Sequence, residues 1–239
     1  MSEPLRSDGA WTYWRPDAEG VVEMGAVAGH NVALPTHFHE EHQLTFVLCG
    51  RRRFVVGERA VVVSAGDAAW IPARVPHHSM AEPGGVECVN LYVRPGEYDE
   101  AAIVRSVELH WAACGRLDAR DLAAAVQRHG LPAAAEPPPC PGGVLRRHAR
   151  VAEAAAHAGM SREGYSRAFA ARYGMPPAAY RRAAQLNDAR ELLRGGEGIA
   201  AAAAQSGFAD QSHLGRWFRR AFGVTPGRYR HGSRSSQAF

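Results

Sequence analysis

Histidines at two places in the first third of the chain have the residue type and spacing of ligands for a metal ion or a polar small molecule. His37 and His39 stand two residues apart, and on a strand such positions face the same side. His77 lies in a later segment, and Gln43 follows His39 by four residues. Three imidazoles are enough for an open site on zinc, iron or nickel, whereas the neutral amide of Gln43 is a poor metal ligand.

These residues allow three interpretations. The one we favour is a pocket for a small-molecule effector, or a gate to it, formed by His37, His39, Gln43 and His77. The second is a structural metal ion on His37, His39 and His77, and the third is plain packing. We predict no cofactor and no catalytic residues, because the motifs of nucleotide-binding and hydrolytic enzymes do not occur in a fitting context.

Arginines are the second group of residues whose side chains could bind a ligand, and they are concentrated in the C-terminal part of the chain. Residues 145–239 contain 16 arginines against six acidic residues, a balance of +10. Residues 1–144 contain 12 arginines against 18 acidic residues, a balance of −6. The chain has no lysine, so its fixed side-chain cations are guanidinium groups, which suit forked contacts with phosphate or guanine. This division predicts two domains, of which the basic one binds a polyanion.

The basic part contains an internal repeat with the layout of two helix-turn-helix modules. Residues 151–159 match residues 199–207 at an offset of 48, and Arg167 then matches Arg216 at an offset of 49. In each copy a short Ala-rich helix ends at a glycine, and a polar residue caps a second helix. These glycines and caps are Gly159 with Ser161, and Gly207 with Asp210.

A connecting helix is predicted between the two modules, over residues 176–196, with a glycine pair at its end. Its apolar stripe consists of Tyr180, Ala183, Leu186, Ala189 and Leu193. About 18 helical residues span roughly 27 Å. Such a helix can hold two recognition helices near one turn of DNA apart, roughly 34 Å, so that one molecule contacts two successive major-groove segments.

The elements that position the histidines are short strands. β-branched and aromatic segments are separated by Gly, Pro or polar turns, one of them the CGRRR sequence at 49–53, which predicts a sandwich or small barrel. The predicted strands cover 21–27, 43–49, 52–57, 60–65, 67–73 and 86–93. Helices follow over 97–113 and 118–129, and residues 131–143 form a Pro-rich connector. We therefore predict an α+β chain: a β-barrel followed by helices, a linker, and an all-α domain with two helix-turn-helix modules. The predicted boundaries are 1–95, 96–130, 131–144 and 145–232.

Two segments of the chain allow two interpretations each. Trp11, Tyr13 and Trp14 either line or cover the mouth of the barrel, or cover its outside. The helix over 97–113 either forms a dimer surface or packs back onto the barrel.

Composition and targeting signals limit the class of protein. The chain of 239 residues is 46% hydrophobic and 22% charged, and it lacks the apolar run of about 18 residues that a membrane helix needs. The N-terminus has no secretory signal pattern, and four cysteines are scattered without a CxxC pair. These features predict a cytoplasmic protein that does not bind membranes.

Two stretches of the basic part resemble the AraC/XylS family of transcriptional regulators. The sequence GFADQSHLGRWFRRAFGVTPGRYR at 207–230 resembles the family signature, and AGMSREGYSRAFAARYGMPPAAYRR at 158–182 resembles its first helix-turn-helix more loosely. In the acidic part, residues 35–57 and 65–79 resemble the two motifs of a cupin-type effector domain. The family usually has a full helix before the first module, whereas here only VLRRHA (144–149) separates it from the linker.

The resemblance assigns DNA contacts residue by residue. The implied base-reading positions are Arg162, Glu163, Ser166, Arg167, Gln211, Ser212 and Arg216, and Gly215 has no side chain to offer. The implied phosphate contacts include Arg219 and Arg220, with Arg172, Arg228 and Arg230 as further candidates. Gly164 within the first recognition helix costs about 1 kcal/mol relative to alanine, so we expect the first module to be the more marginal one.

The functional prediction is a regulator, not an enzyme, that binds double-stranded promoter DNA and responds to a small molecule in the cupin barrel. Activation is the commoner role in the family, which implies RNA polymerase as a partner, and a homodimer is a further possibility. One alternative is a metal-binding cupin enzyme or a metal sensor fused to a DNA-binding domain. Another is a structural cupin that binds a partner and has an occluded barrel.

Overall fold

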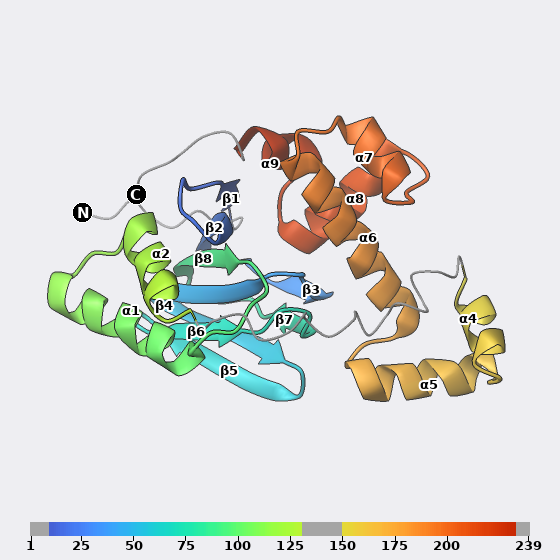
Figure 1. Cartoon of the computed structure of the whole chain (residues 1–239), viewed down its shortest axis with the longest axis horizontal. Coiled ribbons are helices and arrows are strands. Elements are labelled where there is room, and N and C mark those ends of the chain that lie inside the picture. The colour runs from blue at the N-terminus through green and yellow to red at the C-terminus, as the bar shows by residue number, and fades with distance from the viewer. Residues whose placement is uncertain (1–9, 131–149, 233–239) are drawn as a thin grey trace.

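The computed structural model describes residues 10–130 and 150–232. The predicted linker at 131–144, and the VLRRHA segment after it, lie outside these residues. The described chain has two halves, a rolled sheet with two covering helices and a cluster of six helices (Figure 1). The prediction of an α+β chain with a cupin-like β-barrel and an all-α half is confirmed, and the barrel has the form of a half-barrel sheet. None of the helices in the described ranges is long and apolar enough to span a membrane.

The first half is built on eight antiparallel strands. They are β1 (Ala10–Trp14), β2 (Val21–Gly29), β3 (Leu34–His37), β4 (His42–Val56), β5 (Arg59–Ser64), β6 (Ala68–Ile71), β7 (His77–Ser79) and β8 (Val86–Val93). Their order is β1-β2-β8-β4-β7-β3, and β5 and β6 also pair with β4. The sequence patterns missed β1 and β3, and they predicted no separate strand at β7.

β4 is one long strand where a turn was predicted, so the CGRRR prediction is wrong. The strand continues through Gly50, which has a φ of +73° and lies against Gly85. A Cβ at Gly50 would lie 2.2 Å from the Gly85 carbonyl oxygen, so the close approach requires glycine. A bulge between Val47 and Cys49 bends the strand. β4 therefore pairs with β6 and β8 in its first part and with β5 and β7 in its second.

Two helices, α1 (Glu100–Cys114) and α2 (Ala119–Arg128), cover one face of the sheet (Figure 1). Ile103 and Val107 of α1 are buried in a cluster that also contains Leu44 and Phe46 of β4. Of the two interpretations of the 97–113 helix, the structure shows packing onto the sheet. Leu109 on the outer side of α1 is 63% exposed.

The helical half contains the two predicted modules. Its helices are α4 (Val151–His157), α5 (Arg162–Tyr173), α6 (Pro177–Arg194), α7 (Ile199–Gln205), α8 (Gln211–Phe222) and α9 (Pro226–Gly232). Gly159 and Gly207 adopt the predicted left-handed conformation. The side chain of Ser161 accepts a hydrogen bond from the Gly164 amide, and that of Asp210 accepts one from the His213 amide. The predicted stripe of α6 is buried along its whole length.

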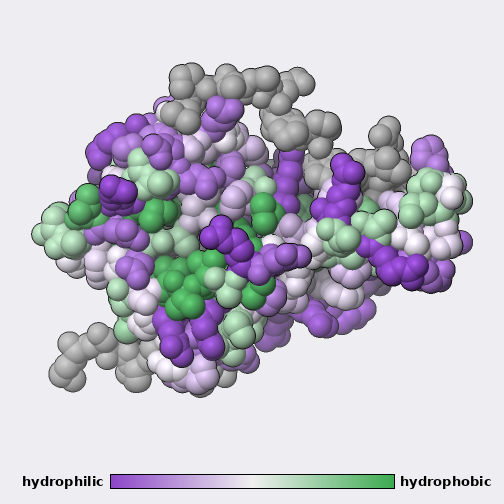
Figure 2. Space-filling model, turned by 90° about the horizontal axis from the view of Figure 1, so that it is seen from below, coloured by the Kyte–Doolittle hydropathy of each residue, from purple (hydrophilic) through white to green (hydrophobic). Residues whose placement is uncertain are grey.

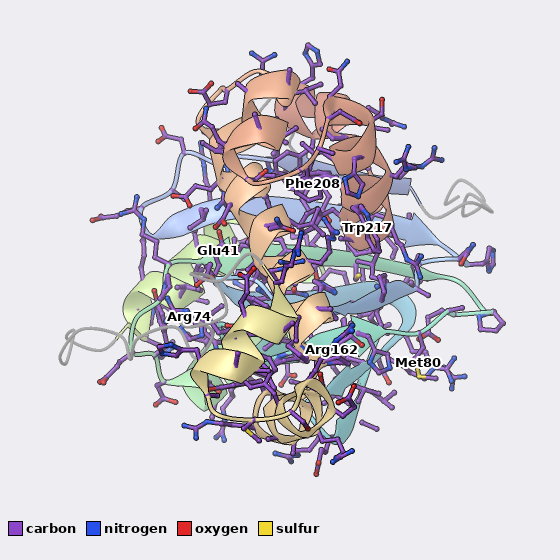
Figure 3. The ribbon with its side chains drawn as sticks, turned by 90° about the vertical axis from the view of Figure 1, so that its right-hand side faces the viewer. Glu41, Arg74, Met80, Arg162, Phe208 and Trp217 are labelled. Atoms are coloured by element: carbon purple, nitrogen blue, oxygen red, sulfur yellow. The ribbon has the colours of Figure 1, made fainter. Side chains whose placement is uncertain are left out.

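A buried ion pair holds α6 against the sheet. The Arg190 guanidinium donates to the Glu23 carboxylate of β2, and both side chains are at most 2% exposed. Burial lowers the pKa of Arg190, but Glu23 together with Tyr229, Glu41 and Tyr92 outweighs burial, and the pKa is raised well above its ordinary value. One turn further along, Arg194 pairs with Glu41, which lies beside α6 in Figure 3. The helical half is therefore docked on the sheet through charges buried at the contact.

The N-terminal strand supplies the apolar part of the same contact. Trp11 and Tyr13 belong to one core cluster with Phe222 and Tyr229 of the helical half. The Tyr13 hydroxyl donates to the Phe222 carbonyl at 3.0 Å. A Cβ at Gly223 would lie 2.1 Å from the Trp11 ring. Strand β1 thus lies at the sheet edge, and these two aromatic rings pack between the halves.

We expect Glu23→Gln to lower the free energy of unfolding by about 3–5 kcal/mol, because it leaves the Arg190 charge buried without its partner. The double variant Glu23→Leu/Arg190→Met removes both charges and should lose less than the single one. Arg74→Met, in the more exposed Arg74–Glu40 pair, is the control and should lose less than about 1 kcal/mol. Urea unfolding of the full chain measures all three. A double variant as unstable as Glu23→Gln would contradict this view of the pair.

Candidate functional site

The three predicted histidines meet at one end of the sheet. His37 ends β3, His39 lies in the loop before β4, and His77 begins β7. Their potential ligand atoms lie within 4.8 Å of one another, and the His77 ring lies 4.4 Å from that of His37 and 4.7 Å from that of His39, centre to centre. His39 and His77 are buried, and His37 is half-buried. We call His37, His39 and His77 the imidazole cluster.

A backbone carbonyl lies against Nδ1 of each ring of the cluster. Nδ1 of His37 lies 2.8 Å from the Pro35 oxygen, Nδ1 of His39 lies 2.9 Å from the Glu41 oxygen, and Nδ1 of His77 lies 2.9 Å from the Val75 oxygen. A carbonyl oxygen only accepts, so in His37 and His77 the hydrogen is on Nδ1 and Nε2 keeps a lone pair. Both ring nitrogens of His39 face oxygen acceptors, so its neutral ring can donate to only one of them. Burial lowers the pKa of all three rings, that of His77 to about 4. The cluster is therefore neutral at pH 7.

Gln43 joins the cluster through a buried polar network. Its Oε1 lies 2.8 Å from Nε2 of His39. Its Nε2 donates to Thr45 Oγ1 at 2.7 Å and to Asn90 Oδ1 at 3.0 Å, which turns the amide oxygen toward His39. The structure thus brings together all four residues predicted for the effector pocket. Thr45 and Asn90 were missed. Thr45 stands two residues after Gln43, and this same-face spacing was the available signal.

Neutral imidazoles with free Nε2 lone pairs and Nδ1–H groups bonded to carbonyls are the usual form of histidine ligands for metals. The donor chemistry of His37 and His77 therefore fits a divalent ion, whereas Nε2 of His39 is engaged with Gln43 in this structure. Gln43 Oε1 adds an uncharged oxygen beside His39.

A cleft of about 610 Å³ opens between the two halves beside the cluster. Its apolar walls include Phe38 from the sheet half and Met175, Leu186 and Phe222 from the helical half. His37 belongs to both the cleft and the cluster. Sequence patterns missed this cleft, because its walls come from segments far apart in the chain.

Two arginines line the cleft, Arg182 of α6 and Arg220 of α8. The Arg182 guanidinium lies 5.2 Å from the Phe208 ring centre and 4.9 Å from that of Trp217, and it donates to Gln185 Oε1 at 3.2 Å. Burial lowers its pKa. In the described ranges, no carboxylate lies within ion-pair distance of either guanidinium. The cleft therefore has apolar walls and positive charge.

The residues with predicted DNA contacts form two groups, one on α5 and one on α8, away from the cluster. Ser166 is half-buried, and the others are exposed: Arg162, Glu163, Arg167, Gln211, Ser212, Arg216, Arg219 and Arg220. Arg162 of α5 and Trp217 of α8 mark the two modules in Figure 3, and Trp217 lies beside Arg182 in the first half of α6. Arg230, a further candidate for phosphate contact, is half-buried and donates to the Gly196 carbonyl at 2.9 Å, so it supports the helical half.

Two family models match the chain, one in each half. A helix-turn-helix domain matches residues 154–232, and a cupin domain matches residues 24–93. No curated protein matches the chain at a significant level. Among solved structures, fatty-acid-bound ToxT from Vibrio cholerae is 10% identical with a TM-score of 0.52, and the match covers 98% of each chain. That likeness extends the shared fold over both halves.

The helical half is a helix-turn-helix DNA-binding domain of the AraC type, and the sheet half is a cupin domain. A second ToxT structure from the same organism matches 94% of this chain and 100% of its own, at 10% identity and a TM-score of 0.48. A cupin barrel protein from Leptotrichia buccalis is 22% identical over 37% of this chain and 43% of its own, with a TM-score of 0.33.

We expect Thr45→Val to lower the free energy of unfolding by about 1–3 kcal/mol, because it leaves Gln43 Nε2 without one acceptor and removes a bond of 2.7 Å to Asn90. Thr12→Val, an exposed change on β1, is the matched control and should change it by less than about 0.5 kcal/mol. Urea unfolding at pH 7 measures both. Equal stability of the two variants would show that the network does not support the regulator's fold.

Proposed function

We propose that this regulator binds two successive major-groove segments of promoter DNA with α5 and α8. The observation that carries the proposal is the pair of capped modules with exposed arginine-bearing faces, joined by an α6 whose stripe is buried. At about 1.5 Å per residue, the 18 residues of α6 span roughly 27 Å. That length is compatible with recognition helices about one DNA turn apart, once their own offsets are added.

The proposed contacts divide into base and phosphate contacts. Arg167, Gln211 and Arg216 reach base edges, since arginine and glutamine can make forked hydrogen bonds to guanine and adenine. Arg162, Glu163, Ser166 and Ser212 are the other proposed base-reading residues. Arg219 and Arg220 on α8 are proposed for phosphates, with exposed Arg172 and Arg228 as further candidates. Phosphate contacts give the affinity its dependence on salt concentration.

For Arg216→Ala we expect a loss of about 1–3 kcal/mol in specific binding and a relaxed preference at one base position. For Arg219→Ala we expect weaker binding to every sequence and a salt slope smaller by about 1. Arg128→Ala, an exposed arginine of α2, is the control and should bind as the unchanged protein does.

The measurement uses fluorescence anisotropy with operators selected by the full chain from random DNA, at several salt concentrations. If Arg216→Ala kept the affinity and the base preferences of the unchanged protein, the proposed docking of α8 would be wrong.

We further propose that the effector occupies the cleft at the mouth of the cupin domain, with His37 in its wall, and that it has an apolar body and an anionic head. Three observations support this chemistry: the apolar walls, the volume of about 610 Å³ and the two arginines without a carboxylate partner in the described ranges. The fatty acid bound to ToxT has the same chemistry. Because both halves line the cleft, such a ligand would alter how the DNA-binding domain is docked.

Oleate below its micelle concentration is expected to raise the melting temperature by roughly 5 °C, because a ligand of the folded state stabilises it. Oleyl alcohol, which lacks the carboxylate, should give a smaller rise. Arg182→Gln should reduce the effect of oleate, and Ala179→Trp, which fills the cleft from an exposed lining position, should abolish it. Ala124→Trp on α2 is the matched control. An equal response of Ala179→Trp and Ala124→Trp would place oleate elsewhere.

The remaining parts of the proposal rest on the family resemblance. We infer activation through contact with RNA polymerase in the cytoplasm, and a cupin domain that binds its ligand without transforming it. A homodimer through the outer side of α1, where Leu109 is exposed, is the proposed assembly. Figure 2 shows the molecule from below, which is the side where β5 lies in Figure 1, and apolar residues gather on this side of the cupin half. One exposed apolar residue of β5 is Val62, which is 61% exposed.

The imidazole cluster favours a second candidate function, a regulator that responds to a metal ion. The specific observation is the set of three imidazoles whose potential ligand atoms lie within 4.8 Å of one another, with the Nδ1–H groups of His37 and His77 bonded to carbonyls. Oleate and a metal ion separate the two candidates, since their sites share only His37.

A further inference from the structure

Phe38 belongs to the cupin domain in the chain, but its side chain lies in the core of the first helix-turn-helix module. It is 1% exposed, and its core cluster contains Phe169 of α5 and Tyr180 of α6. The rings of Phe38 and Tyr180 stack with centres 4.6 Å apart. Tyr180 in turn makes a T-shaped contact with the Phe169 ring at 5.4 Å between centres. A ring of the cupin domain is therefore one aromatic contact away from the first recognition helix.

The two recognition helices differ in how many of their own residues are buried. α5 is described over its whole length of 12 residues, and Phe169 is its one buried residue. α8 has the same length and buries four residues, which are Leu214, Phe218, Ala221 and Phe222. Most of the stability of a helix in a protein comes from the packing of its buried face. The order of α5 therefore depends strongly on what surrounds a single side chain.

The first module packs against the cupin domain at a second point. Gly174 ends α5 in the left-handed conformation, and a Cβ there would lie 3.7 Å from the Pro76 ring of the cupin domain. Asn187 Nδ2 of α6 donates to the Phe38 carbonyl at 2.9 Å and so holds the backbone that carries the ring. Figure 1 shows α4 and α5 at the lower end of α6, apart from α7, α8 and α9. The support for α5 beyond its own module therefore comes from the cupin domain.

The second module also contacts the cupin domain, but its core is built from its own residues. Phe218 of α8 packs on Phe222 and on Tyr229 of α9, with ring centres 4.6 and 5.2 Å apart. Trp11 of the cupin domain lies against Gly223, at the end of α8. Loss of Trp11 would remove a neighbour of the second module, whereas loss of Phe38 would remove part of the core of the first.

We propose that Phe38 is a positioning residue for α5: it orders the first recognition helix, so that the docked protein contacts two major-groove segments and the undocked protein contacts one, through α8. This control rests on the proposed function, in which α5 and α8 each contact one segment. Phe38, Met175 and Ala183 belong both to the core of the first module and to the wall of the cleft. A ligand in the cleft would therefore lie against the core on which α5 depends.

The effect on DNA binding follows from conformational entropy. A loosened α5 must become ordered when it binds DNA, and that ordering reduces what its contacts contribute to the affinity. Arg167, exposed on α5, should therefore contribute to binding while the Phe38 ring is in place and contribute little once the ring is removed. Thermodynamic linkage makes the dependence reciprocal, so DNA that engages α5 also favours docking.

The variants separate the Phe38 ring from docking in general. Phe38→Ala removes the ring, and Phe38→Leu keeps an apolar side chain in its place. Asn187→Ala keeps the ring but removes the bond to its carbonyl, and Gln185→Ala on the same helix is its matched control, because the Gln185 amide bonds Gly207 within the DNA-binding domain. Trp11→Ala is the matched control for the ring, because it removes an aromatic ring of the cupin domain that lies against the second module.

Hydrogen exchange of the full chain without DNA measures the order of each helix. In Phe38→Ala the amides of α5 should exchange about tenfold faster or more, and those of α8 should change by less than about threefold. Phe38→Leu should restore part of the protection, and Asn187→Ala should accelerate α5 more than Gln185→Ala does. Trp11→Ala should accelerate α5 less than Phe38→Ala does, because it leaves the Phe38 ring in place.

Three results of this measurement would overturn the role of Phe38. They are protection of α5 in Phe38→Ala equal to that of the unchanged protein, equal acceleration of α5 and α8 in that variant, and an effect of Trp11→Ala on α5 as large as that of Phe38→Ala. If Phe38→Ala does not fold, the comparison of Asn187→Ala with Gln185→Ala decides, and equal exchange of α5 in these two variants overturns the proposal.

Fluorescence anisotropy with an operator selected by the full chain measures the consequence for DNA. Arg167→Ala should weaken binding about tenfold in the unchanged background and less than about twofold in the Phe38→Ala background. Arg216→Ala, on α8, should weaken binding by a similar factor in both backgrounds. An Arg167→Ala effect of equal size in both backgrounds overturns the proposal. If Arg167→Ala has no effect with Phe38 in place, the proposed DNA contact of α5 is wrong, and hydrogen exchange still decides whether Phe38 orders α5.

Discussion

Two opposite charges buried where α6 crosses the sheet constrain the whole molecule. A charge removed from water is tolerated only next to its partner, so Arg190 and Glu23 permit one placement of the DNA-binding domain on the cupin domain. The apolar contact of Trp11 and Tyr13 with the last helices is compatible with the same placement. A buried ion pair adds little net stability, but it makes alternative dockings costly. The cleft and the position of α5 follow from this placement.

The imidazole cluster, the cleft and the first helix-turn-helix module are connected by direct contacts. Gln43 and the imidazole cluster lie in the cupin domain, His37 is shared with the cleft, and Phe38 enters the module that carries α5. The exposed arginines of α5, and Arg216 and Arg219 of α8, do not line the cleft, whereas Arg220 of α8 does. A ligand at the cluster or in the cleft would therefore act where the two domains are held together, and would reach the DNA-contacting helices through packed side chains.

Sequence patterns among residues close together in the chain predicted the helical half well. The repeat, the glycine turns, the caps at Ser161 and Asp210 and the buried stripe of α6 depend on residues within a few positions of one another, and the structure confirms each of them. The sheet was harder to predict. The glycine and arginines at 50–53 look like a turn, but Gly50 allows the backbone of β4 to pass against Gly85, which is distant in sequence. Strand β1 was missed for a similar reason, because its aromatic residues are packed against the other half.

The sequence by itself determined the class of protein: two domains of opposite charge, a double helix-turn-helix with guanidinium groups, and histidines spaced to meet. Periodicity, capping and composition encode these features over short stretches of chain. Only the tertiary structure decided that the domains dock, that Phe38 completes the core of the neighbouring domain, and that a cleft with two arginines lies between them. Such contacts join residues more than a hundred positions apart, and no local pattern records which distant side chains will bury one another's charges and apolar surface.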